Sequence, residues 1–265
     1  KTHKIFSNRV LNLIRKGDFL NFLQKSFIQQ MFFVHNRLYL LNYLLELKKT
    51  KKWKFWKRIL KESSVGNPVR YFLYPWSSGN KIFQAYHLKQ YEDFSQINLK
   101  EFDVIVEFGG GYGNMACMFK KINPTTKYII FDTFEVSLLQ FYYLKRNKVN
   151  VAFEENSKHT NSVHLFHSIK KLKLKLASFE KQSKKLFIAN WSISETPAKL
   201  RNDMRFLFRE FDYQLISFQK QFENTDNYKY FSGLLNYNNR KKRSSKIKKI
   251  KNMSNHFYLF SKKTN

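Results

Sequence analysis

Cysteine, acidic residues and long apolar runs are all scarce in this chain of 265 residues. The single cysteine, Cys117, excludes a disulfide framework and a zinc site built from cysteines, and it fits a reducing compartment. The most apolar window, residues 31–47, contains polar residues such as Arg37 and Glu46, so we expect no transmembrane segment. No secretory signal is visible, and we expect a cytoplasmic protein, or one of an organellar matrix if a leader has been removed.

The scarcity of acidic residues leaves a large positive charge: 49 Lys and Arg against 19 Asp and Glu give a net charge of +30. A polyanion partner, such as RNA or an anionic membrane surface, is one explanation. Compositional drift in an AT-rich genome is the other, because Lys greatly outnumbers Arg and Phe, Ile, Asn and Tyr are abundant. Drift does not explain the scarcity of acids, so we expect part of the charge to have a function.

Two basic runs are candidates for binding a polyanion. Residues 48–58 interleave basic side chains with aromatic ones, which can bind phosphates and stack on bases or sugars. The alternative is a solvated helix face with its aromatic side chains turned inward. Residues 240–251 form the second run, which we interpret as a solvated loop unless a polyanion binds it.

Apolar residues make up 43% of the chain, enough for a large core. Over residues 5–47 they recur at three- and four-residue spacing, which predicts helices that pack on the main domain or lie on a membrane surface. Gly17 and Asp18 mark a break, with Asp18 capping the next helix. We place an N-terminal helical extension at residues 1–62 and a second domain at residues 63–265.

The second domain begins with a structured loop over residues 63–80 and a helix over 81–94. From residue 102 the pattern alternates between short apolar runs and helical stretches. It predicts strands over 104–107, 128–132, 149–153, 186–190, 213–218 and 256–260, and helices over 114–121, 135–146, 166–181 and 197–208. Residues 172–176 alternate Leu with Lys and also fit a strand. Repeated βα units predict an α/β fold with a doubly wound, mostly parallel sheet.

Residues 104–113 read VIVEFGGGYG and contain four of the eight glycines of the chain. A strand, a glycine turn and a helix bring a backbone close to a nucleotide-like ligand at the carboxyl end of a parallel strand. Gly109, Gly111 and Gly113 permit positive φ and leave out Cβ atoms where a ligand must touch the backbone. The helix that starts at Asn114 points free N–H groups at the same place.

Two acidic residues indicate which nucleotide fits this turn. Glu107 precedes the glycines, where a carboxylate repels phosphate and attracts a cation, and the spacing G-x-G-x-G differs from the G-x-G-x-x-G of dinucleotide folds. Asp132 ends the second strand, where a carboxylate suits hydrogen bonds to both ribose hydroxyls. A cationic nucleoside without phosphate therefore fits better than NAD.

The glycine stretch resembles the first motif, E-x-G-x-G-x-G, of the class I S-adenosylmethionine-dependent methyltransferases, and Asp132 matches the ribose-binding acid of that family. The resemblance covers residues 102–218. It implies a Rossmann-like fold, S-adenosylmethionine as the cofactor and methyl transfer as the reaction. It also implies a donor site made of Glu107, Gly109, Gly111, Tyr112, Gly113, Asp132, Thr133, Glu154, Asn190 and Trp191. In this site Glu154 would contact the adenine edge, and Trp191 would stack on adenine or a sugar unless it only closes the core.

A narrower resemblance is to the sugar O-methyltransferases of polysaccharide gene clusters. It rests on the glycine motif, on residues 131–144 and 190–197, and on the segments 77–80 and 85–88. This resemblance implies O-methylation of a sugar hydroxyl in a glycan or glycoconjugate. The high charge and the long basic C-terminal stretch depart from the family pattern and leave the acceptor open.

A sugar hydroxyl has a high pKa, so a general base or a metal would help to remove its proton. Glu195 follows the fourth strand and is a candidate base, with capping of the helix after Pro197 as the alternative. His87 is the second candidate base, with a structural core or surface histidine as the alternative. The spacing of His159, His164 and His167 gives no clean metal-binding face, and we expect no metal site.

Three functional alternatives remain open from the sequence. The first is a sugar O-methyltransferase. The second is an RNA-associated methyltransferase or a catalytically inactive methyltransferase-like subunit of a ribonucleoprotein, which the charge and the basic runs favour. The third is a membrane-peripheral enzyme that acts on lipid-linked glycans.

Overall fold

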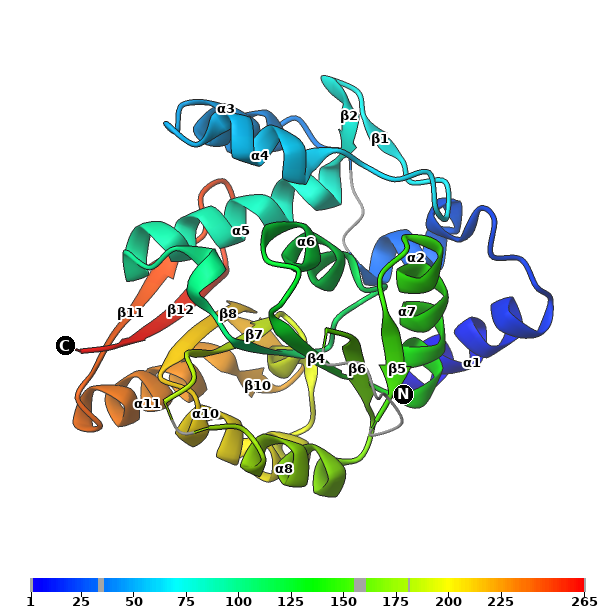
Figure 1. Cartoon of the computed structure of the whole chain (residues 1–265). Coiled ribbons are helices and arrows are strands. Elements are labelled where there is room, and N and C mark those ends of the chain that lie inside the picture. Colours follow the sequence, from blue (N-terminus) through cyan, green and yellow to red (C-terminus); the bar gives the residue numbers. More distant parts are fainter. Residues whose placement is uncertain (1, 33–35, 155–160, 181, 265) are drawn as a thin grey trace.

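The computed structural model describes residues 2–32, 36–154, 161–180 and 182–264 (Figure 1). An eight-stranded sheet forms its centre, with the strand order β11-β12-β8-β7-β3-β4-β6-β5. The strands are β3 (Val104–Phe108), β4 (Lys127–Phe131), β5 (Val151–Phe153), β6 (Val163–Phe166), β7 (Lys185–Asn190), β8 (Tyr213–Gln219), β11 (Arg243–Lys249) and β12 (His256–Lys263). Only β12 runs against its neighbours, β8 and β11, and the other pairings are parallel. The predicted doubly wound, mostly parallel sheet is confirmed.

Helices cover both faces of the sheet, as Figure 1 shows. One face packs on α5 (Gly79–Ser95), α6 (Asn114–Ile122) and α7 (Phe134–Arg146). The other packs on α8 (Ile169–Ala177), α9 (Ala198–Asp203), α10 (Arg205–Glu210) and α11 (Asn227–Arg240). Successive residues of the central strands enter the two cores in turn, so Ile105 lies in one core and Val106 in the other. This two-sided burial explains why the strands read as continuous apolar runs.

The N-terminal residues form α1 (Thr2–Arg15), a 3₁₀ turn (Phe22–Gln24), α2 (Ser26–Met31), α3 (Leu40–Lys48) and α4 (Trp53–Leu60). Their apolar side chains share one core with α5, α6 and the sheet. The break at Gly17 is confirmed, with φ of +64°. Asp18 pairs with Lys25 instead of capping a helix. The domain boundary at residue 62 stays a prediction.

Several elements differ from those predicted. Residues 63–80, predicted as a loop, contain a hairpin of β1 (Arg70–Tyr71) and β2 (Tyr74–Ser78). Residues 172–176 lie in the helix α8, so the strand alternative is wrong. The strand β6 and the helix α11 were missed, as was the short pair β9 (Gln221–Phe222) and β10 (Thr225–Asp226).

The second basic run is not a solvated loop, because seven of its residues form the edge strand β11. This strand has a single aliphatic side chain, Ile247, so its own sequence gives no strand pattern. Its backbone is ordered by the ladder to β12, which is an example of tertiary pairing overriding local propensity. Among the helices of the described residues, none is long and apolar enough to span a bilayer.

A buried ion pair joins the N-terminal segment to α5. Lys81 Nζ lies 2.6 Å from Glu62 Oε1, and both side chains are almost completely buried. The other carboxylate oxygen of Glu62 accepts a hydrogen bond from Ser78 Oγ at 2.5 Å. Although burial alone would raise it, the pKa of Glu62 is held below its usual value by Lys81 and these hydrogen bonds.

We expect Lys81→Met to destabilise the protein by about 3–5 kcal/mol, because it leaves the carboxylate of Glu62 buried without a cation. Urea unfolding at pH 7 measures this change. The double variant Glu62→Gln with Lys81→Met should recover much of the loss, since it removes both charges. If the double variant were no more stable than Lys81→Met, the buried Glu62 carboxylate would not be the cause of the loss.

Candidate functional site

The glycine turn connects the end of β3 to the start of α6 at the carboxyl edge of the sheet. Gly109, Gly111 and Gly113 have φ of +71°, +57° and +95°, so all three use the left-handed region predicted for them. A Cβ at Gly109 would collide with Ser192, which follows β7, and Ser192 Oγ also donates a hydrogen bond to the carbonyl of Phe108. The turn is therefore held against the end of the neighbouring strand.

Gly110 is a site residue that the sequence reasoning missed. A Cβ there would lie 2.6 Å from Ile130 Cγ2 and 3.2 Å from Glu107 Oε2, so the turn has no room for a side chain. Its φ is not positive, and the motif treats its position as variable. The run of three glycines was the only signal in the sequence.

Two carboxylates lie beside the turn, as predicted from the ends of the first two strands. Glu107 is 4% exposed, and its Oε2 accepts a hydrogen bond from the Tyr128 hydroxyl at 2.8 Å. Asp132 is partly buried and accepts hydrogen bonds from the Thr133 N–H at 2.9 Å and from Gln140 Nε2 at 2.8 Å.

Gln140 ties the two halves of this site together. Its Nε2 donates to Asp132 Oδ2 and, at 2.9 Å, to the carbonyl oxygen of Gly111. Its Oε1 is buried and has no hydrogen-bond partner within the described protein. The sequence does not indicate this role, because a glutamine on α7 has no motif of its own and contacts the turn only in the folded chain.

The environment within the protein favours the neutral form of both acids. Burial raises the pKa of Glu107 to about 8, against the effect of the Tyr128 hydrogen bond, and the nearby Asp132 raises it further. Burial also raises the pKa of Asp132 to about 7, although hydrogen bonds from Thr133, Gln140 and Gly110 favour the charged carboxylate. A cation or hydroxyl donors placed here would favour the charged forms.

The strand next to β4 is β6, not β5. The residues that follow β6 therefore lie beside Asp132. The Asp132 N–H donates to the carbonyl of Phe166, the last residue of β6. His167 follows β6, and its ring lies 5.4 Å from that of Phe134, which is 48% exposed. Glu154, predicted from β5, lies 3.3 Å from His167 Nε2 and also pairs with Lys171. The predicted acid is therefore near this edge, whereas Phe134 and His167 were missed because β6 was.

The loop after β7 brings Asn190 and Trp191 to the same edge. Trp191 has φ of +61°, is 6% exposed and donates from Nε1 to His256 Nδ1 at 2.8 Å. Asn190 Oδ1 accepts from Ser217 Oγ at 2.8 Å, whereas its buried Nδ2 has no hydrogen-bond partner within the described protein. A left-handed tryptophan is costly, so neighbouring packing must hold it there.

The remaining predicted residues lie in different surroundings. Glu195 is partly buried in the 3₁₀ turn after β7 and accepts from Gln219 Nε2 at 3.3 Å. His87 is 1% exposed and lies 2.5 Å from the Tyr258 hydroxyl through Nδ1. Burial lowers the pKa of His87 to about 3, so the ring is neutral. Tyr112 is 2% exposed, and its hydroxyl accepts from Asn80, so this side chain belongs to the core.

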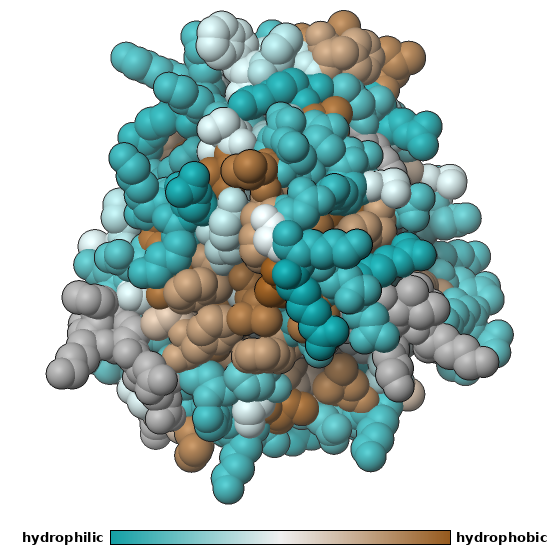
Figure 2. All heavy atoms as spheres, turned by 90° about the vertical axis from the view of Figure 1, so that its right-hand side faces the viewer, coloured by the Kyte–Doolittle hydropathy of each residue, from teal (hydrophilic) through white to brown (hydrophobic). Residues whose placement is uncertain are grey.

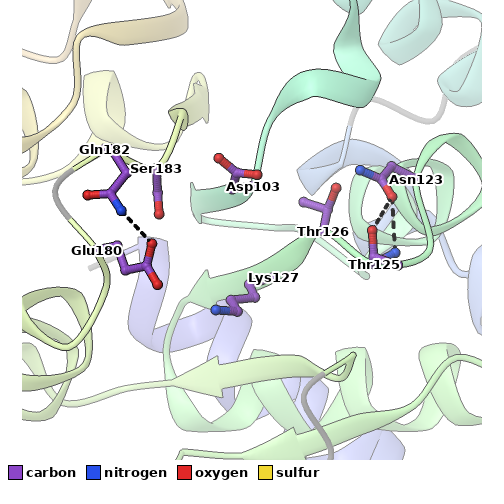
Figure 3. Close-up of a pocket in the computed structure, with 8 residues that line it drawn as sticks. All are labelled: Asp103, Asn123, Thr125, Thr126, Lys127, Glu180, Gln182 and Ser183. Atoms are coloured by element: carbon purple, nitrogen blue, oxygen red, sulfur yellow. Dashed lines mark hydrogen bonds between the residues drawn. The ribbon is translucent and has the colours of Figure 1, made fainter.

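A cavity away from the glycine turn has a different character. A shallow polar cavity of about 270 Å³ lies at the opposite edge, by the amino ends of β3, β4 and β7 (Figure 3). Its lining includes Asp103, Lys127 and Glu180, and the Asp103 carboxylate accepts from the Lys184 N–H. Among the residues placed by the structure, no three His, Cys, Asp or Glu side chains form a group able to hold a metal ion. His159 lies outside the described residues.

No family model matches the chain, and no curated protein matches it. Among solved structures it is similar to an rRNA methylase from Streptococcus thermophilus, with 11% identity, a TM-score of 0.48 and coverage of 67% of this chain and 96% of that one. It is also similar to precorrin-6y C5,15-methyltransferase from Geobacter metallireducens, with 11% identity, a TM-score of 0.45 and coverage of 68% and 87%. A third similar structure is an O-methyltransferase family protein from Burkholderia thailandensis, with 9% identity, a TM-score of 0.44 and coverage of 85% of this chain and 71% of that one.

Likeness at these values does not identify a reaction, which has to be inferred from the site itself. The sheet supports the fold independently: seven parallel strands, a single antiparallel strand between β8 and β11, and helices on both faces. The chain thus has a Rossmann-like fold with a doubly wound, mostly parallel sheet and an N-terminal helical extension.

We expect Glu107→Gln to stabilise the protein at high pH. The folded-state pKa of Glu107 is about 8, above the ordinary value, so its stabilising contribution is complete below about pH 4.5 and is lost as pH rises through 8. The stability difference between Glu107→Gln and wild type should grow by on the order of 3 kcal/mol from pH 5 to pH 9. Urea unfolding at both pH values tests this, and an unchanged difference would contradict it.

Proposed function

We propose that the chain transfers a methyl group from S-adenosylmethionine to a sugar hydroxyl. The observation that carries the donor assignment is the joint placement of Glu107, Asp132 and the glycine turn, with Gln140 bonded to both Asp132 and Gly111. This arrangement offers acceptors for ribose hydroxyls and a negative group near a cation, next to a backbone without Cβ atoms.

The two raised pKa values support a ligand with a positive charge and free hydroxyls. An anionic phosphate beside Glu107 and Asp132 would raise both pKa values further, whereas a methionine ammonium or a sulfonium would lower them. Ribose hydroxyls donating to Asp132 would likewise favour its carboxylate form. Donor binding should therefore release protons near neutral pH.

The edge formed by Phe134 and His167 supports a place for the adenine ring. Phe134 follows Asp132 by two residues, and half of its side-chain surface is exposed beside His167. An aromatic face next to the ribose-binding acid can stack on a base. Glu154, held near His167, would accept from the exocyclic amine in this proposal.

For the chemistry we propose Glu195 as the general base. Methyl transfer is an in-line displacement on an activated donor, so the protein mainly aligns the acceptor oxygen and removes its proton. Glu195 follows the strand end that adjoins the glycine turn and keeps part of its surface accessible. His87 suits this role less well, because it is buried and its pKa is far below neutrality.

The sugar acceptor is supported by the sequence resemblance and by the loop that carries it. Residues 190–197, part of that resemblance, contain the left-handed Trp191 and the buried Asn190 Nδ2, which has no hydrogen-bond partner among the described residues. A buried donor without a partner can be satisfied by an acceptor hydroxyl. RNA is the rival acceptor, favoured by the net charge of +30.

We expect wild-type protein to bind S-adenosylmethionine in titration calorimetry, and Asp132→Ala to bind it about 10–100-fold more weakly. Affinity falls because the variant lacks the carboxylate that would accept hydrogen bonds from the two ribose hydroxyls. Glu210→Ala, which removes an exposed carboxylate on α10, is the matched control and should bind normally. No binding by wild type, or an equal loss in both variants, would contradict the donor assignment.

We expect Glu195→Gln to lower the turnover number about 100-fold or more, with donor affinity unchanged, because a general base contributes this much. The assay uses labelled donor with nucleotide-sugar and glycan acceptors, and RNA in a parallel reaction. Donor affinity measured on the same preparation separates chemistry from misfolding. Methylation of RNA but not of sugars would overturn the acceptor, and full activity of Glu195→Gln would overturn the base.

A further inference from the structure

The β1–β2 hairpin (Arg70–Ser78) and the loop before α3 expose large apolar side chains next to the basic helix α4. Trp76 is 71% exposed, Leu38 72%, Phe72 51% and Leu73 45%. We call these four residues, together with the exposed basic residues of 48–58, the hairpin surface. Scattered exposed apolar residues are ordinary, but a group on one projecting hairpin marks an interaction surface.

Hydrogen bonds and ring contacts hold these parts together. The Tyr71 hydroxyl donates to the carbonyl of Leu38 at 3.4 Å, and the Phe72 N–H donates to Asn36 Oδ1 at 3.3 Å. On the other side of the hairpin the ring of Tyr74 lies 6.4 Å from that of Trp53 on α4. Lys48 Nζ lies within 6 Å of both rings. The apolar hairpin and the basic helix therefore form one continuous surface.

The charge of this surface has one sign. Residues 48–58 contain seven Lys and Arg and no acid. In α4 the apolar side chains Trp56, Ile59 and Leu60 are fully buried, whereas Lys54 and Lys57 are exposed. Of the carboxylates close to it, Glu62 is buried against Lys81, and Glu92 pairs with Lys52 of the run, which leaves most of its basic residues without a carboxylate among the described residues.

The hairpin surface lies on a projecting part of the molecule. In Figure 1 the hairpin extends from the top of the molecule beside α3 and α4. Figure 2, turned about the vertical axis, shows hydrophobic side chains at the top of the molecule with hydrophilic ones next to them. An apolar tip beside basic side chains can enter the lipid headgroup region while the lysines meet lipid phosphates.

We propose that the hairpin surface docks this protein on an anionic lipid membrane. Each Lys or Arg near an anionic surface adds about 1 kcal/mol of attraction, and tryptophan favours the membrane interface. Neither signal alone gives stable attachment, but an inserted apolar tip and a polybasic face together do. RNA fits less well, since Leu38 and Leu73 cannot stack on bases and a projecting tip offers no groove for a strand. The inference does not depend on the proposed methyl transfer.

Co-sedimentation with vesicles tests the proposal with the full chain. Wild type should bind vesicles of phosphatidylglycerol and phosphatidylcholine and release at high salt, with little binding to phosphatidylcholine alone. Lys54→Glu with Lys57→Glu should bind about 30-fold more weakly or worse, since at least 2 kcal/mol of attraction is lost. Trp76→Ser should bind about 10-fold more weakly, because the indole no longer enters the interface.

Two matched controls separate this surface from general charge and apolarity. Lys246→Glu with Lys249→Glu makes the same charge change, with the same spacing, on exposed positions of β11. Leu20→Ser changes a leucine 73% exposed elsewhere, for comparison with Leu38→Ser at 72%. Both controls should bind anionic vesicles as tightly as wild type does. Leu38→Ser should bind them more weakly.

Three results would overturn the proposal. The first is no binding of the folded wild type to anionic vesicles. The second is equal weakening by the β11 and α4 charge variants, which would mean attraction by net charge alone. The third is a dimer or an RNA complex that Trp76→Ser disrupts while vesicle binding persists. Far-UV circular dichroism of each variant excludes loss of fold as the cause.

Discussion

The backbone of the glycine turn runs so close to its neighbours that no side chain fits between them, and the candidate site depends on this close approach. Ser192 from the end of β7 fills the space at Gly109, and Ile130 of β4 fills it at Gly110. Gln140 then fixes the other side by holding the Gly111 carbonyl and the Asp132 carboxylate at once. The glycine turn thus contacts the ends of β4 and β7 and the helix α7. Glu107, Asp132 and the loop after β7 therefore lie at the same edge of the sheet.

The burial of Glu107 beside the glycine turn disfavours the charged form of its carboxyl group. Glu107 is buried with one hydroxyl donor, and its pKa rises to about 8 because the charged form is poorly solvated. Two buried polar atoms of the site, Gln140 Oε1 and Asn190 Nδ2, also have no hydrogen-bond partner among the residues that the structure describes. Groups left in this condition destabilise a protein unless something else satisfies them. A ligand that brings a positive charge and hydroxyl groups would satisfy them.

The sequence predicted those parts of the site whose signal is local. A strand, its acid and the glycines follow one another within ten residues, and Asp132 directly follows the next apolar run. Gln140 and Gly110 were missed because their roles arise from contacts across the fold. The strand β6 was missed because its four residues include His164 and follow a polar segment, and with it the pairing of Phe134 and His167 was lost. The strand β11 exists through its ladder to β12, which no pattern within a lysine-rich run can indicate.

The N-terminal residues were ambiguous in sequence between core helices and membrane-surface helices, and the structure divides them. Phe22 and Phe32 pack on Tyr112, and Phe32 also lies 3.3 Å from where a Cβ of Gly111 would be. Glu62 neutralises Lys81 beneath the same turn. Because these side chains support the glycine turn, most apolar residues of the segment are not available to a membrane. Leu38 stays exposed beside the exposed side chains Phe72, Leu73 and Trp76 of the hairpin, and these four can meet lipid.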